Sequence, residues 1–208
     1  MQPDFKIAVL ISGGGTTLKN LLEFRRQGRL LADIVQVISS NPSANGNSFA
    51  TDNSIPLEII ERSSFETTSA FSKAIFDVCK HANVNLVVMG GFLKRVRIQP
   101  EFENKVINIH PSLIPAFSGK GFYGSRVHKA VIEYGCKVSG CTVHFVDDQY
   151  DHGPIIAQRS LNIDSSETTE SLAQRVFQLE CQVYPEVINL LARNLISVND
   201  RTVTIASS

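Results

Sequence analysis

The chain has 208 residues, a length that suits one domain, and its 20 basic and 20 acidic side chains balance to a formal net charge of zero. That balance gives no support to nonspecific binding of nucleic acid or of a membrane surface, and no segment reaches the apolar length needed to cross a bilayer. Four scattered cysteines without a C-x-x-C pair argue against a zinc site or a disulfide framework, and they predict a cytoplasmic protein.

Short apolar runs alternate with helical patterns over the first half of the chain. The apolar runs predict buried strands, and the helical patterns between them predict crossover helices. This order predicts an α/β fold, an open, doubly wound, mostly parallel Rossmann-like sheet, in which ligands bind beyond the carboxyl ends of the strands. Strands are expected at 6–11, 34–39, 56–60 and 85–89, and helices at 16–28, 65–82 and 100–104.

A glycine-rich loop joins the first strand to the first helix. The backbone N–H groups of such a loop and the positive end of a helix together favour an anion. The dinucleotide fingerprint fails because Leu18 stands at its third glycine position, and no G-K-[ST] follows as in ATP-binding loops. A site for a single phosphate is therefore predicted, with a tight turn that binds nothing as the alternative. Its residues are Gly13, Gly14, Gly15, Thr16 and Thr17.

The stretch 106–114, V-I-N-I-H-P-S-L-I, predicts a buried strand followed by a proline-stiffened loop. Asn108 and His110 are two residues apart, so their side chains share one face of the strand. This pair suits acyl transfer, because an amide can hold a developing oxyanion and an imidazole can hold or move a proton. The alternative is a polar pair with a structural role only.

The second half of the chain predicts antiparallel strands and one long helix. Strand patterns at 137–146 and 154–163 lie on either side of an acidic turn. The longest helical pattern covers 168–195, and Pro185 is expected to kink or restart this helix. Glu180 lies beside the apolar stripe of the helix, either as a boundary charge or as a ligand for a cation. A terminal hairpin is expected over 196–205.

Three motifs of this sequence resemble those of the folate-dependent formyltransferases: N-I-H-P-S-L-I-P at 108–115, T-V-H-F-V at 142–146 and D-H-G-P at 151–154. With the I-S-G-x-G loop at 11–15, the chain is most similar to the branch that formylates glycinamide ribonucleotide in purine biosynthesis. The resemblance implies transfer of the formyl group of the co-substrate 10-formyltetrahydrofolate to the amine of 5'-phosphoribosylglycinamide, without a metal. It also implies one domain over 1–208, with a nucleotide-binding half to about 105 and a folate-binding, catalytic half from 106.

The resemblance further implies roles for single residues. Asn108 and His110 would hold the oxyanion, and Asp151 would lie against His110 and favour its protonated form. The loop 13–17 would hold the substrate phosphate, and Glu180 would meet the substrate amine. The resemblance implies a cis peptide at Ile114–Pro115, and it places Thr68 where related proteins often carry an arginine for the folate tail. The expected folate-binding residues are Phe92, Leu93, Lys94, Arg95, Val96, Asn108, Asp147, Tyr150, Asp151 and Thr68.

Two other functions fit the same residues. A 10-formyltetrahydrofolate hydrolase could use Asn108, His110 and Asp151 with water as the nucleophile, although such hydrolases usually carry an extra domain before the catalytic part. A noncatalytic phosphate- or nucleotide-binding module would use the glycine loop alone and leave those three residues unexplained. The glycine-rich excursion at 118–124 receives no chemistry, and the sequence leaves open whether the protein is a monomer or a homodimer.

Overall fold

The computed structural model describes residues 5–206 and divides them into two compact units, one ending at Asn108 and the other starting at Ile109. Seven strands hydrogen-bond in the order β3-β2-β1-β4-β5-β6-β7, and strand β5 (Val106–His110) carries the border between the units. The neighbours from β3 to β5 run parallel, whereas β6 and β7 run antiparallel. This confirms the predicted mostly parallel sheet with antiparallel strands in the second half.

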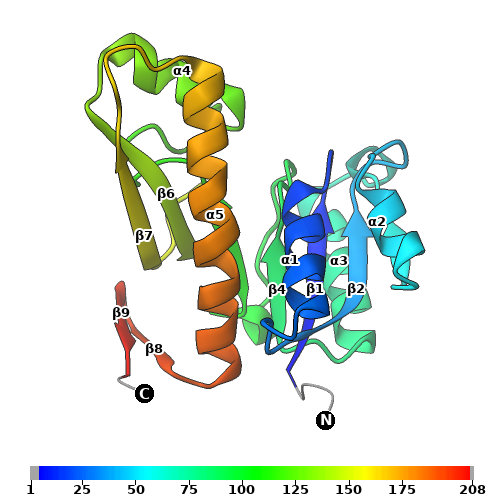
Figure 1. Cartoon of the computed structure of the whole chain (residues 1–208). Coiled ribbons are helices and arrows are strands. Elements are labelled where there is room, and N and C mark those ends of the chain that lie inside the picture. Colours follow the sequence, from blue (N-terminus) through cyan, green and yellow to red (C-terminus); the bar gives the residue numbers. More distant parts are fainter. Residues whose placement is uncertain (1–4, 207–208) are drawn as a thin grey trace. The chain divides into compact units, whose positions relative to one another are not determined.

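The first unit is a parallel sheet whose strand order reverses at β1 (Lys6–Ile11). Because β2 lies on one side of β1 and β4 on the other, the loops after β1 and β4 flank the switch point where such sheets bind ligands. Residues Ile7 to Ile11 are fully buried, as expected for a strand covered on both faces. The other elements, coloured from blue to green in Figure 1, are α1 (Thr16–Arg26), β2 (Asp33–Ser39), α2 (Asn47–Asp52), β3 (Leu57–Ile59), α3 (Thr68–His81) and β4 (Leu86–Met89), with 3-10 turns η1 (Arg62–Ser64) and η2 (Pro100–Phe102).

Local chemistry explains where two of these elements differ from the expected bounds. Helix α3 begins at Thr68 rather than near 65, because the Thr67 hydroxyl accepts from the Ala70 amide at 3.1 Å and caps the helix there. The helix expected at 100–104 is a single 3-10 turn in which Phe102 is the buried residue. Neither difference alters the order of the elements.

The second unit is an antiparallel strand pair with a long helix. Helix α5 contacts both strands and the short helix α4. No helix in the described part of the chain is long and apolar enough to cross a membrane. The elements are α4 (Ser125–Tyr134), β6 (Val138–Phe145), β7 (Ile155–Asn162), α5 (Thr169–Ala192), and a terminal hairpin of β8 (Ile196–Asn199) and β9 (Thr202–Ile205).

Helix α5 runs unbroken through Pro185, where the sequence pattern predicted a kink or a restart. Figure 1 shows it as one continuous helix. A proline removes one helical hydrogen bond, and the packing of buried side chains on both sides of Pro185 offsets this loss. These side chains belong to Val183, Tyr184, Val187 and Ile188.

Candidate active site

The glycine loop of the first unit leads from β1 into the first turn of α1. Gly15 is the N-cap of the helix and takes a left-handed conformation with φ 67°. A Cβ at Gly15 would lie 2.5 Å from the Cα of Gly46, whose amide donates to the Gly13 carbonyl at 3.0 Å. Glycine is therefore required at position 15 both by the backbone angle and by the close approach of the neighbouring loop.

The start of α1 has the features of an anion site. The first amides of a helix have no partner within the helix and point toward its N-terminal end. The first turn of α1 carries no acidic side chain, while Arg25 and Arg26 occupy the last turn. An added Cβ at Gly13 or Gly14 would meet no heavy atom within 4 Å, so the loop leaves open space beside these amides.

A cavity of about 620 Å³ lies among the loops that follow β1, β2, β3 and β4 in the same unit. Ser12 ties three of these loops together, because its hydroxyl accepts from the Leu93 amide at 2.9 Å and lies 2.7 Å from the Ser40 hydroxyl. The cavity lining contains two cations, Arg62 and Lys94, and one carboxylate. The lining residues are Ser12, Ser40, Asn41, Glu61, Arg62, Ser63, Leu93 and Lys94.

The loop after β4 presents some of the predicted folate-binding residues and buries others. Leu93 is 58% exposed, and Lys94 and Arg95 are also exposed. Phe92 stacks on Phe71 of α3, with the ring centroids 6.4 Å apart. Val96 is only 4% exposed, so a ligand at this loop would meet its backbone and almost none of its side chain.

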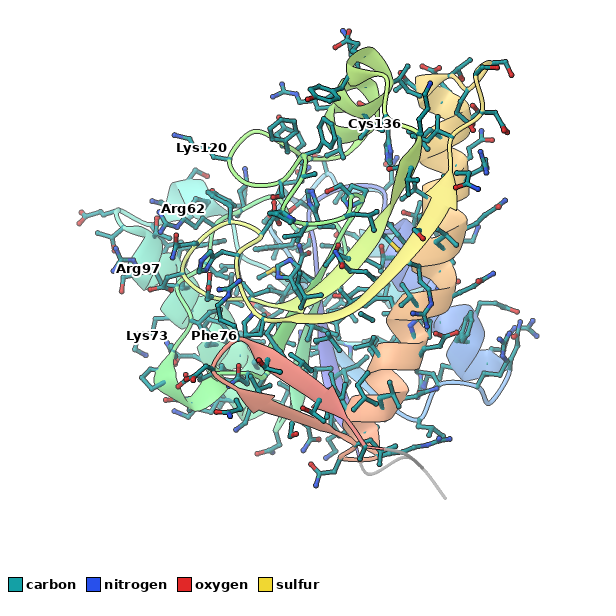
Figure 2. All side chains as sticks on the ribbon, turned by 90° about the vertical axis from the view of Figure 1, so that its left-hand side faces the viewer. Arg62, Lys73, Phe76, Arg97, Lys120 and Cys136 are labelled. Atoms are coloured by element: carbon teal, nitrogen blue, oxygen red, sulfur yellow. The ribbon has the colours of Figure 1, made fainter. Side chains whose placement is uncertain are left out.

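An arginine that the sequence analysis missed lies beside Thr68. Arg62, labelled in Figure 2, donates from Nη2 to the Thr68 hydroxyl at 3.4 Å and from Nη1 to the Phe65 carbonyl at 2.6 Å. A guanidinium group is thus present at the Thr68 position, although residue 68 itself is a threonine. The signal in the sequence was an arginine six residues upstream on the same loop.

In the second unit, His110 and Asp151 form a buried pair. The His110 side chain is almost fully buried, and its Nδ1 lies 3.5 Å from Asp151 Oδ2. Its Nε2 lies 2.9 Å from the Phe117 carbonyl oxygen, which can only accept, so Nε2 carries a proton. Both ring nitrogens therefore face oxygen acceptors, an arrangement that a doubly protonated imidazolium can satisfy at both ends.

Asp151 is held in a strained conformation between two histidines. Its φ of 51° is in the left-handed region, which costs a non-glycine residue on the order of 1–3 kcal/mol and is often found at functional sites. Its Oδ2 accepts from the Gly119 amide at 2.9 Å, and its Oδ1 lies 3.8 Å from His144 Nε2. The predicted pairing of His110 with Asp151 is thus present, and His144 is a neighbour that the predicted site did not include.

Two further buried histidines surround this pair. Burial lowers the pKa of His144, against the opposing effect of its Nδ1 donating to the Phe145 carbonyl at 2.7 Å and of the Asp151 charge. Burial also lowers the pKa of His128 on α4, and the charge of His110 lowers it further. His144 and His128 are therefore neutral near pH 7.

Asn108 and Glu180 complete the predicted catalytic and amine-binding residues. Asn108 is half-buried on β5, where it pairs with Met89 of β4, and strand alternation puts it on the same face as His110. Burial raises the pKa of Glu180 on α5 to about 8. The charge of Glu180 adds to the effect of burial on the thiol of Cys141 in β6, whose pKa is raised to about 12. The Glu180 carboxyl therefore lies close enough to β6 to affect this thiol electrostatically.

The acidic turn before β7 is fastened at several points. Asp147 accepts from the Gln149 amide at 2.8 Å and lies 2.6 Å from His152 Nδ1. Arg201, in the turn of the terminal hairpin, donates to the His152 carbonyl at 2.8 Å. Tyr150 is 47% exposed on the outside of the turn. The peptide between Ile114 and Pro115 is cis, as the sequence motif implied.

The glycine loop at the switch point of the parallel sheet can bind a small anionic ligand, and the buried histidine–carboxylate pair can hold or move a proton. Residues 5–188 match the formyl transferase family, and the chain belongs to this family. Among relatives, the phosphoribosylglycinamide formyltransferase of Bacillus subtilis (strain 168) is 33% identical over 198 residues, which cover 94% of this chain and 97% of that protein.

Other relatives extend this comparison. The chloroplastic phosphoribosylglycinamide formyltransferase of Vigna unguiculata is 38% identical over 92% of this chain, which spans only 62% of that protein. The structure of glycinamide ribonucleotide transformylase 1 from Symbiobacterium toebii has a TM-score of 0.90 at 34% identity, with 98% of this chain and 94% of that chain covered. A formyltetrahydrofolate deformylase from Pseudomonas syringae pv. tomato shares the fold, with a TM-score of 0.84 at 22% identity over 98% of this chain and 66% of its own.

Proposed function

We propose that this protein transfers the formyl group of 10-formyltetrahydrofolate to the amine of 5'-phosphoribosylglycinamide, a step of purine (IMP) biosynthesis in the cytoplasm. The relatives named phosphoribosylglycinamide formyltransferase support the choice of the acceptor substrate. The observation that carries the proposal is the buried pair of His110 and Asp151, which we name the catalytic pair. Asn108 lies two residues before His110 on strand β5. These three residues carry the groups that formyl transfer needs.

The chemistry begins when the neutral amine of the substrate attacks the formyl carbon on N10 of the folate. The electron pair of the carbonyl bond moves to oxygen, and a tetrahedral intermediate with one negative oxygen forms. The Asn108 amide and a protonated His110 stabilise this oxyanion, and loss of one such donor typically costs on the order of 10²–10³ in rate. The 3.5 Å separation of Nδ1 and Asp151 is long enough for the Nδ1 proton to be shared with the oxyanion.

Collapse of the intermediate breaks the bond between the formyl carbon and N10. The oxygen re-forms its double bond, N10 leaves with the electron pair, and a proton passes from the attacking nitrogen to N10. His110, or a water held by Asp151, carries this proton, a type of help worth on the order of 10²–10⁴ in rate. The oxidation state of the formyl carbon does not change, so neither step requires an oxidant or a reductant.

Residues outside the catalytic pair bind the two substrates. The substrate phosphate binds the amides of Gly15, Thr16 and Thr17, where the helix end favours an anion. The Glu180 carboxyl, whose pKa burial raises, accepts a hydrogen bond from the neutral substrate amine. The loop 92–96 and the turn residues Asp147 and Tyr150 contact the pterin.

Arg62 replaces, in this chain, the arginine that related proteins carry at the position of Thr68. Its guanidinium is fixed by the Phe65 carbonyl and the Thr68 hydroxyl, and it lines the 620 Å³ cavity together with Lys94. Two cations in one cavity suit the carboxylates of the glutamate tail of a folate. Thr68 therefore contributes to folate binding by orienting Arg62.

A direct assay tests the proposed function. Purified full-length protein is mixed with 5'-phosphoribosylglycinamide and 10-formyltetrahydrofolate, and the N-formyl product is measured by mass spectrometry. The absence of product from correctly folded protein would overturn the proposal. Omitting the ribonucleotide and measuring free formate tests hydrolysis in the same experiment, and turnover that does not depend on the ribonucleotide would support the hydrolase instead.

A further inference from the structure

Residues 116–124 include the glycine-rich run 118–124 and are here called the excursion. They contact both members of the catalytic pair through the main chain alone. The Phe117 carbonyl accepts from His110 Nε2 at 2.9 Å, and the Gly119 amide donates to Asp151 Oδ2 at 2.9 Å. No side chain of the excursion takes part in either contact, and Lys120 is exposed on it (Figure 2). The substrate roles given above make no use of this segment.

Each of these contacts selects one state of the group that it meets. Because a carbonyl oxygen can only accept, Phe117 requires the proton on Nε2 and leaves Nδ1 toward Asp151. Because an amide N–H can only donate, Gly119 holds Oδ2 as an acceptor and turns that oxygen toward His110. The excursion thus determines both the tautomer of the ring and the direction of the carboxylate.

The backbone that delivers these contacts is strained and clamped. Phe117 has a φ of 50°, a left-handed angle that an aromatic residue rarely adopts. Its ring meets the rings of Phe122 and Tyr134 edge-on, with centroids 6.3 and 5.9 Å away. The Phe122 amide donates to the Gly119 carbonyl at 3.1 Å, which closes a turn whose third residue is Gly121 with φ 97°. The turn and the aromatic contacts therefore hold Phe117 in a conformation that it would otherwise leave.

We propose that residues 116–124 are a positioning element for the catalytic pair, in which the Phe117 carbonyl and the Gly119 amide orient His110 and Asp151 and the aromatic rings lock both groups in place. The kinetic test of this proposal rests on the proposed function, whereas the spectroscopic test depends only on the geometry. Phe117 and Gly119 act through the catalytic pair and are positioning residues.

Two glycines with positive φ give a matched kinetic test. Gly119 has φ 90° and Gly28, which follows α1, has φ 69°, and an added Cβ would meet no heavy atom within 4 Å at either position. Gly119→Ala and Gly28→Ala therefore both introduce backbone strain, but only Gly119 donates to Asp151. We expect Gly119→Ala to lower kcat about tenfold or more, because the strain moves the residue 119 amide away from Asp151, with KM for both substrates changed less than twofold. Gly28→Ala should keep kcat within threefold.

A second pair of variants tests the clamp. Phe117→Leu keeps an apolar side chain but removes the aromatic edges, whereas Phe117→Tyr keeps them and should restore kcat. The ¹⁵N NMR signals of His110 give a readout that needs no turnover. In the natural protein and in Phe117→Tyr we expect Nε2 to stay protonated across the accessible pH range, and in Phe117→Leu we expect a mixture of tautomers.

The outcomes separate the two proposals. Equal losses in Gly119→Ala and Gly28→Ala, an unchanged kcat in Gly119→Ala, or a single His110 tautomer in Phe117→Leu would each overturn the positioning role. A natural protein that forms no N-formyl product, but shows the expected tautomer change in Phe117→Leu, would overturn the proposed function and leave the positioning role standing.

Discussion

Replacing Asp151 with asparagine removes the negative charge of the catalytic pair and keeps nearly the same side-chain shape. Asparagine tolerates a φ of 51° as well as aspartate does, and its side-chain oxygen can still accept from the Gly119 amide. Its NH₂ group can then donate to His144 Nε2, which is unprotonated when His144 is neutral. The variant should therefore fold, and the main loss is the negative charge 3.5 Å from His110 Nδ1.

The size of the effect follows from that separation. Two unit charges 3.5 Å apart attract by about 5 kcal/mol at an effective dielectric constant of about 20. Part of this attraction offsets the cost of burying the carboxylate, so we expect about 2–4 kcal/mol in the transition state, or about a 30- to 1,000-fold loss of kcat/KM. Steady-state formyl transfer and thermal unfolding would be measured side by side, with Asp148→Asn as a control that removes the same charge from an exposed position in the same turn. Turnover of Asp151→Asn within threefold of the natural protein, or an equal loss in Asp148→Asn, would refute the assignment.

Three further substitutions test other parts of the site. For Glu180→Gln, the raised folded pKa means that the natural protein loses stability as pH rises from about 4.5 through about 8. The advantage of the variant in free energy of unfolding, measured by denaturant titration, should therefore widen between pH 5 and 9, by about a few kcal/mol at most, and a constant difference would contradict this. Gly15→Ala should lower Tm and abolish phosphate-ligand binding measured by calorimetry, because its Cβ would lie 2.5 Å from Gly46, whereas Gly14→Ala should leave Tm unchanged. Arg62→Ala should raise KM for folates with a glutamate tail about tenfold without changing kcat, which corresponds to a loss of about 1.4 kcal/mol in binding free energy. The surface variant Lys73→Ala is the control. An equal effect in both variants would contradict a role of Arg62 in folate binding.

The sheet was predictable because its strands carry their signal locally. The run Ile7–Ile11 is apolar throughout, and the structure buries it fully in strand β1, whose bounds Lys6–Ile11 are those predicted. The restart that the local rule allowed at Pro185 does not occur, because the packing of buried residues around it offsets the one hydrogen bond that a proline removes.

The site was less predictable where its groups come from distant residues. Asp151 pairs with His110 across 41 positions of the chain, and only the resemblance of D-H-G-P to a known motif indicated that pairing. Arg62 was missed for a related reason. In a position-by-position comparison residue 68 is a threonine, whereas in the structure the guanidinium of Arg62 donates a hydrogen bond to the Thr68 hydroxyl. Side chains that arrive from another position preserve the chemistry of a site while changing its sequence pattern.

The contacts of the excursion could not be predicted from the sequence at all, because every residue other than proline has both a carbonyl and an amide. What distinguishes Phe117 and Asp151 is their backbone, with φ of 50° and 51°; aspartate is enriched in the left-handed region, but an aromatic residue such as Phe117 gives no signal for it. One strained residue takes part in each contact: the Phe117 carbonyl contacts His110, and the Asp151 carboxylate contacts the Gly119 amide. Relaxation of either backbone would therefore break one contact between the excursion and the catalytic pair. The surrounding packing therefore has to hold both residues in place for the pair to keep its geometry.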